Sequence, residues 1–164
     1  AGQLFLSLVT GHTATHNPGG ESLTRPSQKD NCMIISAQQL VAAAKSQIQE
    51  ITVQQLFSLW QEPHSRLIDV REPEEFNQSH IGSAVNLPRG VLEMKLHQHP
   101  AVAAHCDSQQ ALQALAAQPL YLICRSGARS ALAAQSLQQM GFTQVFSVQG
   151  GFQAWLDAGY PVES

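Results

Sequence analysis

Short runs of apolar residues alternate with longer amphipathic segments along most of this chain. A compact apolar run predicts a buried strand, and apolar residues recurring every three or four positions predict a helix. The predicted strands are residues 51–53, 66–70, 84–87, 120–124 and 145–148. The predicted helices are residues 36–48, 53–60, 73–78, 91–97, 107–117, 128–140 and 151–157. This alternation indicates an α/β fold whose parallel sheet is covered by helices on both faces.

The first 32 residues lack this rhythm. Between Thr10 and Asp30 the chain is rich in Gly, Ser, Thr, Asn and Pro, with almost no apolar periodicity. We therefore expect residues 1–32 to be a disordered tail or a remnant of the expressed sequence. The alternative is an ordered extension in which the apolar residues between Leu4 and Leu8 dock on the domain. Residues 33–49 are expected to form an N-terminal helix extension, followed by the main domain over residues 50–162.

Length and composition fit one globular domain. The chain has 164 residues, of which 43% are hydrophobic and 13% charged, and its net charge is -3. These values predict a packed core and give no reason to expect nucleic-acid or membrane binding. The three cysteines, Cys32, Cys106 and Cys124, form no CxxC pair. Their odd number and wide spacing favour free thiols in a reducing compartment, so we expect a cytoplasmic protein.

The segment from Cys124 to Ser130 (CRSGARS) has the features of an anion site. It follows the most apolar predicted strand and opens a helix, the position where parallel sheets bind their ligands. The first N–H groups of a helix have no intrahelical partner, and the helix dipole adds partial positive charge. Gly127 lets these N–H groups curl into one concavity, and Arg125 and Arg129 add charge. Such surroundings favour the thiolate form of a cysteine.

CRSGARS resembles the active-site loop of the rhodanese family. Three other segments resemble family motifs and occur in the family's order: DVREPEEF at residues 69–76, HIGSAVNLP at residues 80–88 and GGFQAW at residues 150–155. The resemblance covers roughly residues 50–162. Two departures are minor: Ser79 stands where glycine is commoner, and Gly82-Ser83 replaces the commoner Pro-Gly or Arg-Gly.

The resemblance implies a rhodanese-like five-stranded parallel sheet with helices on both faces. It also implies a thiosulfate sulfurtransferase. The Cys124 thiolate would attack the outer sulfur of thiosulfate or another persulfide donor, and the resulting persulfide would pass its sulfur to cyanide, a thiol or a protein cysteine. The expected partners are therefore a small sulfur-containing anion and a thiol or protein acceptor. No cofactor or metal is needed, and we expect a monomer or weak homodimer.

The site residues follow from the same loop. Cys124 is the expected nucleophile, and the substrate-binding residues are expected to be Arg125, Ser126, Gly127, Ala128, Arg129, Ser130 and Arg71. We expect Arg125 to contact the anionic donor and Arg129 to hold the loop by pairing with a carboxylate. Ser130 either bonds the sulfur or caps the helix. Arg71 either faces the pocket or is structural, and Asp69 supports the site without reacting.

Other polar residues have simpler interpretations. Glu72, Glu74 and Glu75 are expected to be a solvated helix start, and His80 a packed loop histidine. A metal site among residues 97–106 has loose spacing, whereas Cys106 as a second redox thiol stays an alternative. We expect residues 88–106 to form a covering helix pair in preference to a rim that selects partners. Gly150 and Gly151 are expected to let the backbone pass close to the active loop.

Three other functions remain alternatives. They are a persulfide carrier or partner-binding module with little thiosulfate turnover, a cysteine-dependent phosphatase, and an arsenate reductase. Related phosphatases have five residues between their cysteine and arginine, whereas only four separate Cys124 from Arg129. The shorter loop forms a tighter cradle, suited to a single sulfur atom and too small for a phosphate group.

Overall fold

The structure is a computed structural model, and it describes residues 34–60 and 66–164. The chain divides into the units Ala1–Met33 and Ile34–Ser164, and the description concerns the second. The prediction made for residues 1–32 therefore lies outside the described residues.

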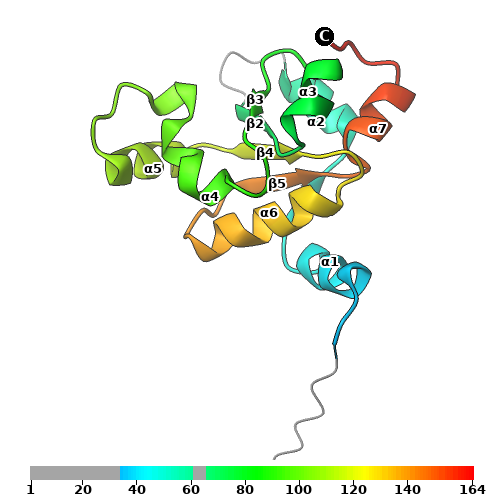
Figure 1. The fold of residues 1–164 in the computed structure, drawn as a ribbon, viewed down its shortest axis with the longest axis horizontal. Coiled ribbons are helices and arrows are strands. Elements are labelled where there is room, and N and C mark those ends of the chain that lie inside the picture. The colour runs from blue at the N-terminus through cyan, green and yellow to red at the C-terminus, as the bar shows by residue number, and fades with distance from the viewer. Residues whose placement is uncertain (1–33, 61–65) are drawn as a thin grey trace, which may run out of the picture. The chain divides into compact units, whose positions relative to one another are not determined.

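Five parallel strands form the centre of the described unit (Figure 1). They are β1 (Gln49–Ile51), β2 (Arg66–Asp69), β3 (Val85–Asn86), β4 (Leu120–Ile123) and β5 (Val145–Val148). Their order across the sheet is β1-β5-β4-β2-β3, and all neighbouring pairs are parallel. The most apolar strand, β4, lies in the middle, and all four of its residues are buried. The predicted α/β fold with a five-stranded parallel sheet is confirmed.

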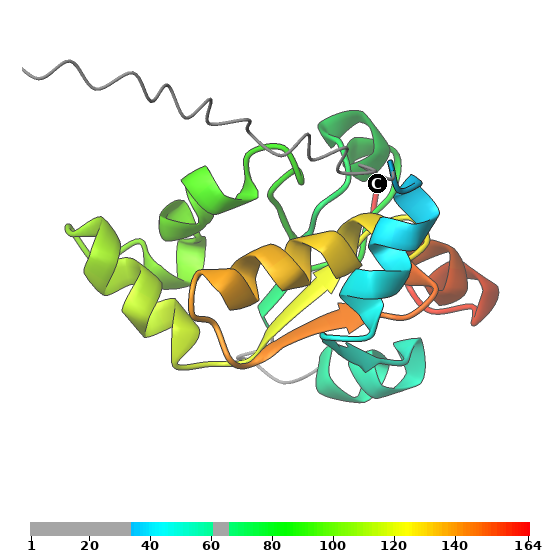
Figure 2. The same ribbon diagram turned by 90° about the horizontal axis from the view of Figure 1, so that it is seen from below.

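Helices cover both faces of this sheet. They are α1 (Ala37–Lys45), α2 (Val53–Trp60), α3 (Pro73–Gln78), α4 (Leu92–Lys95), α5 (Ser108–Ala116), α6 (Ala128–Gln139) and α7 (Gly151–Asp157). Successive residues of a strand point to opposite faces, so β4 contributes to two cores. Leu120 and Leu122 pack with residues of α4, α5 and α6, whereas Tyr121 and Ile123 pack with residues of α2 and α7. Helix α1 lies beside α6 (Figure 2).

One strand lies two residues earlier in the structure than predicted. We expected a strand over residues 51–53, but β1 ends at Ile51. The reason is a capping box at the start of α2: Gln55 N–H donates to Thr52 Oγ1, and Thr52 N–H donates to the Gln55 side chain. The helix therefore begins at Val53 and the strand must end before its cap. The predicted Ser36 cap of α1 is present, with Ser36 and Gln39 forming a second capping box.

The segment over residues 88–106 packs on the core, but it is not the expected pair of helices. In place of the expected helix over residues 91–97, α4 ends at Lys95 and two short 3₁₀ turns follow, Leu96–Gln98 and Pro100–Val102. Leu92, Leu96 and Val102 are buried in the core that α5 and α6 share. Burial, with a smaller effect of the nearby Arg66, lowers the pKa of His99, so its ring stays neutral at neutral pH.

Across residues 34–60 and 66–164, no three His, Cys, Asp or Glu side chains are grouped so that they could hold a metal ion. In the same ranges, every helix is too short or too polar to cross a membrane.

Candidate active site

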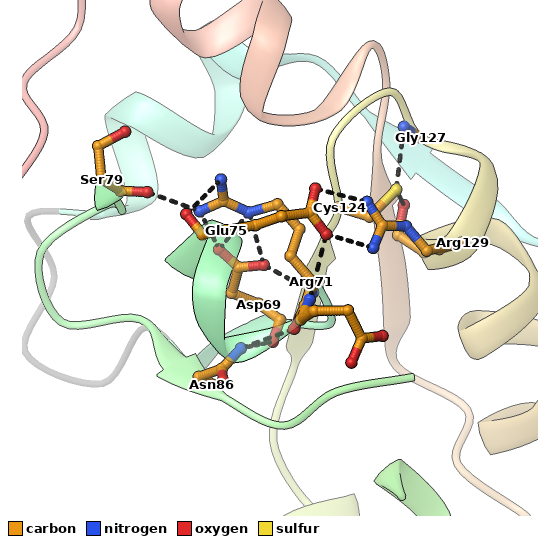
Figure 3. Close-up of polar contacts among 10 residues, drawn as sticks. Asp69, Arg71, Glu75, Ser79, Asn86, Cys124, Gly127 and Arg129 are labelled. Carbon is orange, nitrogen blue, oxygen red and sulfur yellow. Dashed lines mark hydrogen bonds and ion pairs between the residues drawn. The ribbon is translucent and has the colours of Figure 1, made fainter. Parts of the chain in front are cut away.

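Residues of three sequence motifs meet at the carboxyl edge of the sheet (Figure 3), and the fourth motif, residues 150–155, hydrogen-bonds to the Cys124 loop. Asp69 ends β2, Cys124 directly follows β4, and Gly150 follows β5. Because neighbouring parallel strands end at the same edge, residues distant in sequence come together there. The predicted location of the site is therefore the place where the structure brings these residues together.

Cys124 lies at the bottom of its loop and is 1% exposed. The Gly127 N–H donates a hydrogen bond to Cys124 Sγ at 3.1 Å. Gly127, the N-cap of the twelve-residue helix α6, has a φ of +89°, and this left-handed conformation turns its N–H inward. A sulfur anion at this point lies at the positive end of the α6 dipole and has a direct hydrogen-bond donor.

Two serine hydroxyl groups extend this hydrogen bonding into the core. Cys124 Sγ lies 3.5 Å from Ser130 Oγ, which lies 2.9 Å from Ser147 Oγ. Ser130 and Ser147 are fully buried. A hydroxyl group can rotate to donate to a thiolate or accept from a thiol. The first of the two interpretations of Ser130, a hydrogen bond to the sulfur, is the one that the geometry agrees with.

The start of α7 holds the back of the loop. The N–H groups of Phe152 and Gln153 donate to the carbonyl oxygens of Cys124 and Arg125 at 2.7 and 3.0 Å. A Cβ at Gly151 would collide with the Cys124 carbonyl oxygen, and the φ of Gly151 is +62°. The predicted close passage of the glycine pair is therefore present. Helix α7 thus holds the carbonyl side of the loop, and the Gly127 N–H on the same loop donates to the sulfur.

Glu75 and Arg129 form a two-pronged ion pair across the site. Arg129 Nη1 and Nη2 donate to the two carboxylate oxygens of Glu75 at 2.6 and 2.9 Å. This pairing, the arrangement expected for Arg129, lowers the pKa of Glu75 to about 2, and it raises the pKa of Arg129. Glu75 does lie in the expected helix start, where it also accepts from the Glu72 N–H, but its side chain is paired and 32% exposed instead of freely solvated. Helix α3 turns Glu75 towards the loop and leaves Glu72 and Glu74 exposed.

A second ion pair, between Asp69 and Arg71, lies behind the first. Arg71 donates to both carboxylate oxygens of Asp69, and its closest contact, from Nη2, is 2.6 Å. Arg71 also donates to the carbonyl oxygen of Ser79, and its guanidinium lies 3.9 Å from the centre of the Phe152 ring. Asp69 is fully buried and Arg71 is 4% exposed. Figure 3 shows Glu75 between Arg71 and Arg129.

Arg125 and Ser126 form the exposed rim of the loop. Within residues 34–60 and 66–164, Arg125 has no carboxylate partner. Its charge is therefore available to an anion, in contrast to the neutralised charges of Arg71 and Arg129. Ala128, the first residue of α6, is half-buried.

Two other candidate residues, His80 and Cys106, are not among the described residues that hydrogen-bond to Cys124 Sγ. His80 stacks on Phe76 at 4.0 Å, and its Nδ1 lies 3.1 Å from the Phe76 carbonyl oxygen, which agrees with a packed loop histidine. Cys106 is exposed before α5 and, like Cys124, is a free thiol.

Sequence reasoning missed two residues of the site, Glu75 and Ser147. Three adjacent acidic residues at a helix start gave no indication of which one faces the loop. Ser147 carried a weak signal, since it is a polar residue at an inward position of the otherwise apolar strand Val145–Val148.

A sheet of this order with a buried cysteine at a helix N-terminus defines the class: an α/β protein that places a cysteine thiol at the start of a helix. The model of the family "Rhodanese-like domain" matches residues 52–158, more than half of the chain. The chain therefore belongs to the rhodanese-like domain family.

Three relatives illustrate the range of this similarity. The uncharacterized protein YqhL of Bacillus subtilis is 35% identical over 91 residues, which span 56% of this chain and 60% of that protein. A protein of unknown function from Rhodopseudomonas palustris, described as a possible tyrosine phosphatase, has a TM-score of 0.65 at 30% identity, over 80% of this chain and 96% of that one. The polysulfide-sulfur transferase homodimer from Wolinella succinogenes has a TM-score of 0.59 at 28% identity, over 77% of this chain and 85% of that one.

Proposed function

We propose that the protein is a sulfurtransferase that moves a sulfane sulfur from thiosulfate, or another persulfide donor, to a thiophilic acceptor through a persulfide on Cys124. The observation that carries this proposal is the position of Cys124 Sγ, which accepts the Gly127 N–H at the start of α6. This arrangement favours a nucleophilic thiolate and a negatively charged persulfide alike.

In the first step, the Cys124 thiolate attacks the outer sulfur of thiosulfate. A new S–S bond forms to Cys124, the S–S bond of thiosulfate breaks, and its electron pair leaves with sulfite. Arg125 attracts the dianion to the rim of the loop. The terminal sulfur of the persulfide carries the negative charge, which the N–H groups of the loop stabilise.

In the second step, a nucleophile attacks the terminal sulfur of the persulfide. With cyanide the product is thiocyanate, and the electron pair of the broken S–S bond returns to Cys124 as the thiolate. The covalent persulfide divides one difficult transfer into two easier displacements. The loop binds an anion before and after each of them.

The relatives support this proposal at two levels. Membership of the rhodanese-like domain family favours sulfur chemistry at the loop cysteine. The Wolinella succinogenes neighbour is named as a polysulfide-sulfur transferase, and we extend sulfur transfer to this chain as part of the proposal.

A thiocyanate assay tests the proposal. With thiosulfate and cyanide, the wild type should form thiocyanate, and Cys124→Ser should reduce the rate to that of the buffer. Cys106→Ser is the matched control, because it removes the exposed thiol and should keep the wild-type rate. Thiocyanate formation by Cys124→Ser at the wild-type rate would contradict the proposed nucleophile.

A further inference from the structure

His99 carries a buried hydrogen-bond donor that has no acceptor. The residue joins the two 3₁₀ turns that follow α4, and it is 4% exposed. Its Nδ1 accepts the Ala101 N–H at 3.1 Å, so the proton of the neutral ring is on Nε2. Nε2 is buried and has no hydrogen-bond partner among the residues that the structure describes. Because buried donors in folded proteins nearly always have a partner, this one indicates a missing acceptor.

Arg66, the first residue of β2, carries a second donor of this kind. Its Nη1 is buried and likewise has no hydrogen-bond partner in the described ranges. The guanidinium also has no carboxylate partner there, whereas Arg71, Arg89 and Arg129 are each paired with one. A partly buried cation without a counterion is costly to the folded protein. Arg66 therefore requires a negatively charged partner.

The fold brings these two donors to one region. Alternate residues of a strand point to the same face, so Arg66 points to the face of Ile68. Ile68 packs with Leu96 and Val102, which lie on either side of His99 in the chain. The charge of Arg66 contributes to the lowered pKa of His99, so the two side chains lie within electrostatic reach of each other. The region is the one where the 3₁₀ turns cover the start of β2.

This region is separate from the sulfur site. Arg66 pairs in register with Leu120, the first residue of β4, whereas Cys124 follows the last residue of β4. Four residues of strand span about 13 Å. The two donors therefore lie at the amino edge of the sheet, opposite to the edge at which the active loop is found.

The donors define the chemistry of the partner. Neither Arg66 Nη1 nor a protonated Nε2 of His99 can accept a hydrogen bond, so the partner must be an acceptor. A water molecule can accept from both donors, but it leaves the charge of Arg66 without a counterion. An oxyanion supplies separate oxygens to the two donors and the negative charge as well. The burial of His99 restricts this partner to an ion of a few atoms.

We propose that Arg66 and His99 bind a small inorganic oxyanion, such as sulfate, at the amino edge of the sheet. One oxygen accepts from Nη1 of Arg66 and another from Nε2 of His99. The ion enters from the side of Arg66, which is partly exposed, whereas His99 is closed to solvent. The inference does not depend on the reaction proposed for Cys124.

A sulfate titration followed at His99 tests the site. Long-range ¹H–¹⁵N spectra of the full chain report the histidine rings, and His99 is assigned by through-bond correlations. Sodium sulfate replaces sodium chloride at constant ionic strength. The wild type should show the proton on Nε2, and this signal should shift along a saturable curve. A proton on Nδ1, or no saturable shift, would overturn the inference, the latter because water alone would then satisfy the two donors.

Arginine variants show which cation holds the ion. Arg66→Gln should weaken the dissociation constant measured at His99 about tenfold, because it removes the charge-assisted hydrogen bond. Arg66→Lys keeps the charge without the forked geometry and should weaken it less. The matched control is Arg89→Gln, since Arg89 is already paired with Glu93, and it should leave the constant unchanged. An unchanged constant in Arg66→Gln would overturn the inference.

A second control separates this site from the active loop, which also attracts anions. Arg125→Gln removes the exposed cation of that loop and should leave the sulfate response of His99 unchanged. Loss of the response in Arg125→Gln would place the ion at the active loop and overturn the inference. Sulfate should also raise the Tm of the wild type more than that of Arg66→Gln, because a ligand that binds the folded state stabilises it. Equal shifts in the two proteins would contradict the assigned site.

Discussion

At the scale of single residues, Cys124 Sγ is almost fully buried and hydrogen-bonded on two sides. The Gly127 N–H and the Ser130 hydroxyl are the groups that contact it, and Ser147 supports the second of these. A buried anion requires such partners, since leaving it without them is costly. A buried cysteine is either a small packed side chain or a reactive thiolate. The hydrogen-bonded serines beside Cys124 favour the second of these roles.

Ser130→Ala should slow the loading of Cys124 by thiosulfate roughly tenfold, because it removes a hydrogen bond to a charged sulfur. Stopped loading reactions measured by intact mass give the rate. Ser136→Ala is the control, since this hydroxyl lies on the same helix and bonds Arg89 instead of the sulfur. A wild-type loading rate in Ser130→Ala would show that the hydroxyl only caps the helix.

Glu75→Gln should make stability less dependent on pH. The pKa of Glu75 is lowered in the folded protein, so its contribution is present above the unfolded pKa and is lost as the pH falls towards about 2. The pair is partly exposed, so the wild type should be about 1 kcal/mol more stable than the variant at neutral pH. This difference should shrink below about pH 4.5 in guanidinium unfolding.

Exposed Glu74, on the same turn of α3, provides the control. Glu74→Gln should change stability little at any pH. A Glu75→Gln effect that is constant from neutral to acidic pH would contradict the assigned ion pair with Arg129.

At the scale of elements, the starts of two helices build the site. Helix α6 directs the Gly127 N–H at the sulfur, and α7 takes up the carbonyl oxygens of Cys124 and Arg125. The short helix α7 therefore contributes by holding backbone, while the longer α6 contributes the dipole. This division explains why the glycine pair belongs to the same site as the cysteine loop.

Gly151→Ala should destabilise the protein by more than the replacement of a left-handed glycine alone, because the added Cβ also collides with the Cys124 carbonyl oxygen. Gly159 is the matched control, because its φ of +70° is close to that of Gly151 and nothing lies within 4 Å of an added Cβ. Gly159→Ala should cost about 1 kcal/mol of unfolding free energy, and sulfur loading should be retained. Gly151→Ala should cost about 2 to 4 kcal/mol and lose most of the loading. Equal losses in the two variants would contradict the close approach.

The sequence predicted elements best where a local signal marks their ends. Pro73 marked the start of α3, Ser36 capped α1, and Gly141 ended α6, so these bounds agree with prediction to within a residue. Strand β1 shifted because the Thr52 capping box competes with the strand for the same residues. A short apolar run alone does not reveal which of two local structures wins.

The candidate site shows a similar limit. The loop from Cys124 to Ser130 was visible because strand, glycine and helix start are contiguous. Glu75 was not, because its orientation depends on how α3 packs at the edge of the sheet, a tertiary property. The cavity lined by Arg71, Arg125 and Leu156 could not be predicted either, since it joins residues from three separate segments.

At the scale of the whole molecule, the parallel sheet collects the ends of β2, β4 and β5 at one edge. The residues after these strands, Arg71, Cys124 and Gly151, are thereby brought to one place. The same scaffold is shared with a neighbour described as a possible tyrosine phosphatase, so the reaction must be decided by the loop.

The protein should not hydrolyse p-nitrophenyl phosphate. The loop has four residues between Cys124 and Arg129, and Glu75 already occupies the Arg129 guanidinium that a phosphate would need. Absorbance of released nitrophenol measures the rate, and sulfur loading of the same sample controls for folding. Hydrolysis that depends on Cys124 would contradict the assignment to sulfur chemistry.

Intact mass spectrometry after incubation with thiosulfate tests the central claim most directly. The wild type should gain the mass of one sulfur atom, and cyanide should remove that mass as thiocyanate appears, whereas Cys124→Ser should gain nothing. A gain on both proteins would shift the nucleophile to Cys106 or Cys32 and contradict the assignment of Cys124. No gain on the wild type would contradict thiosulfate as the sulfur donor.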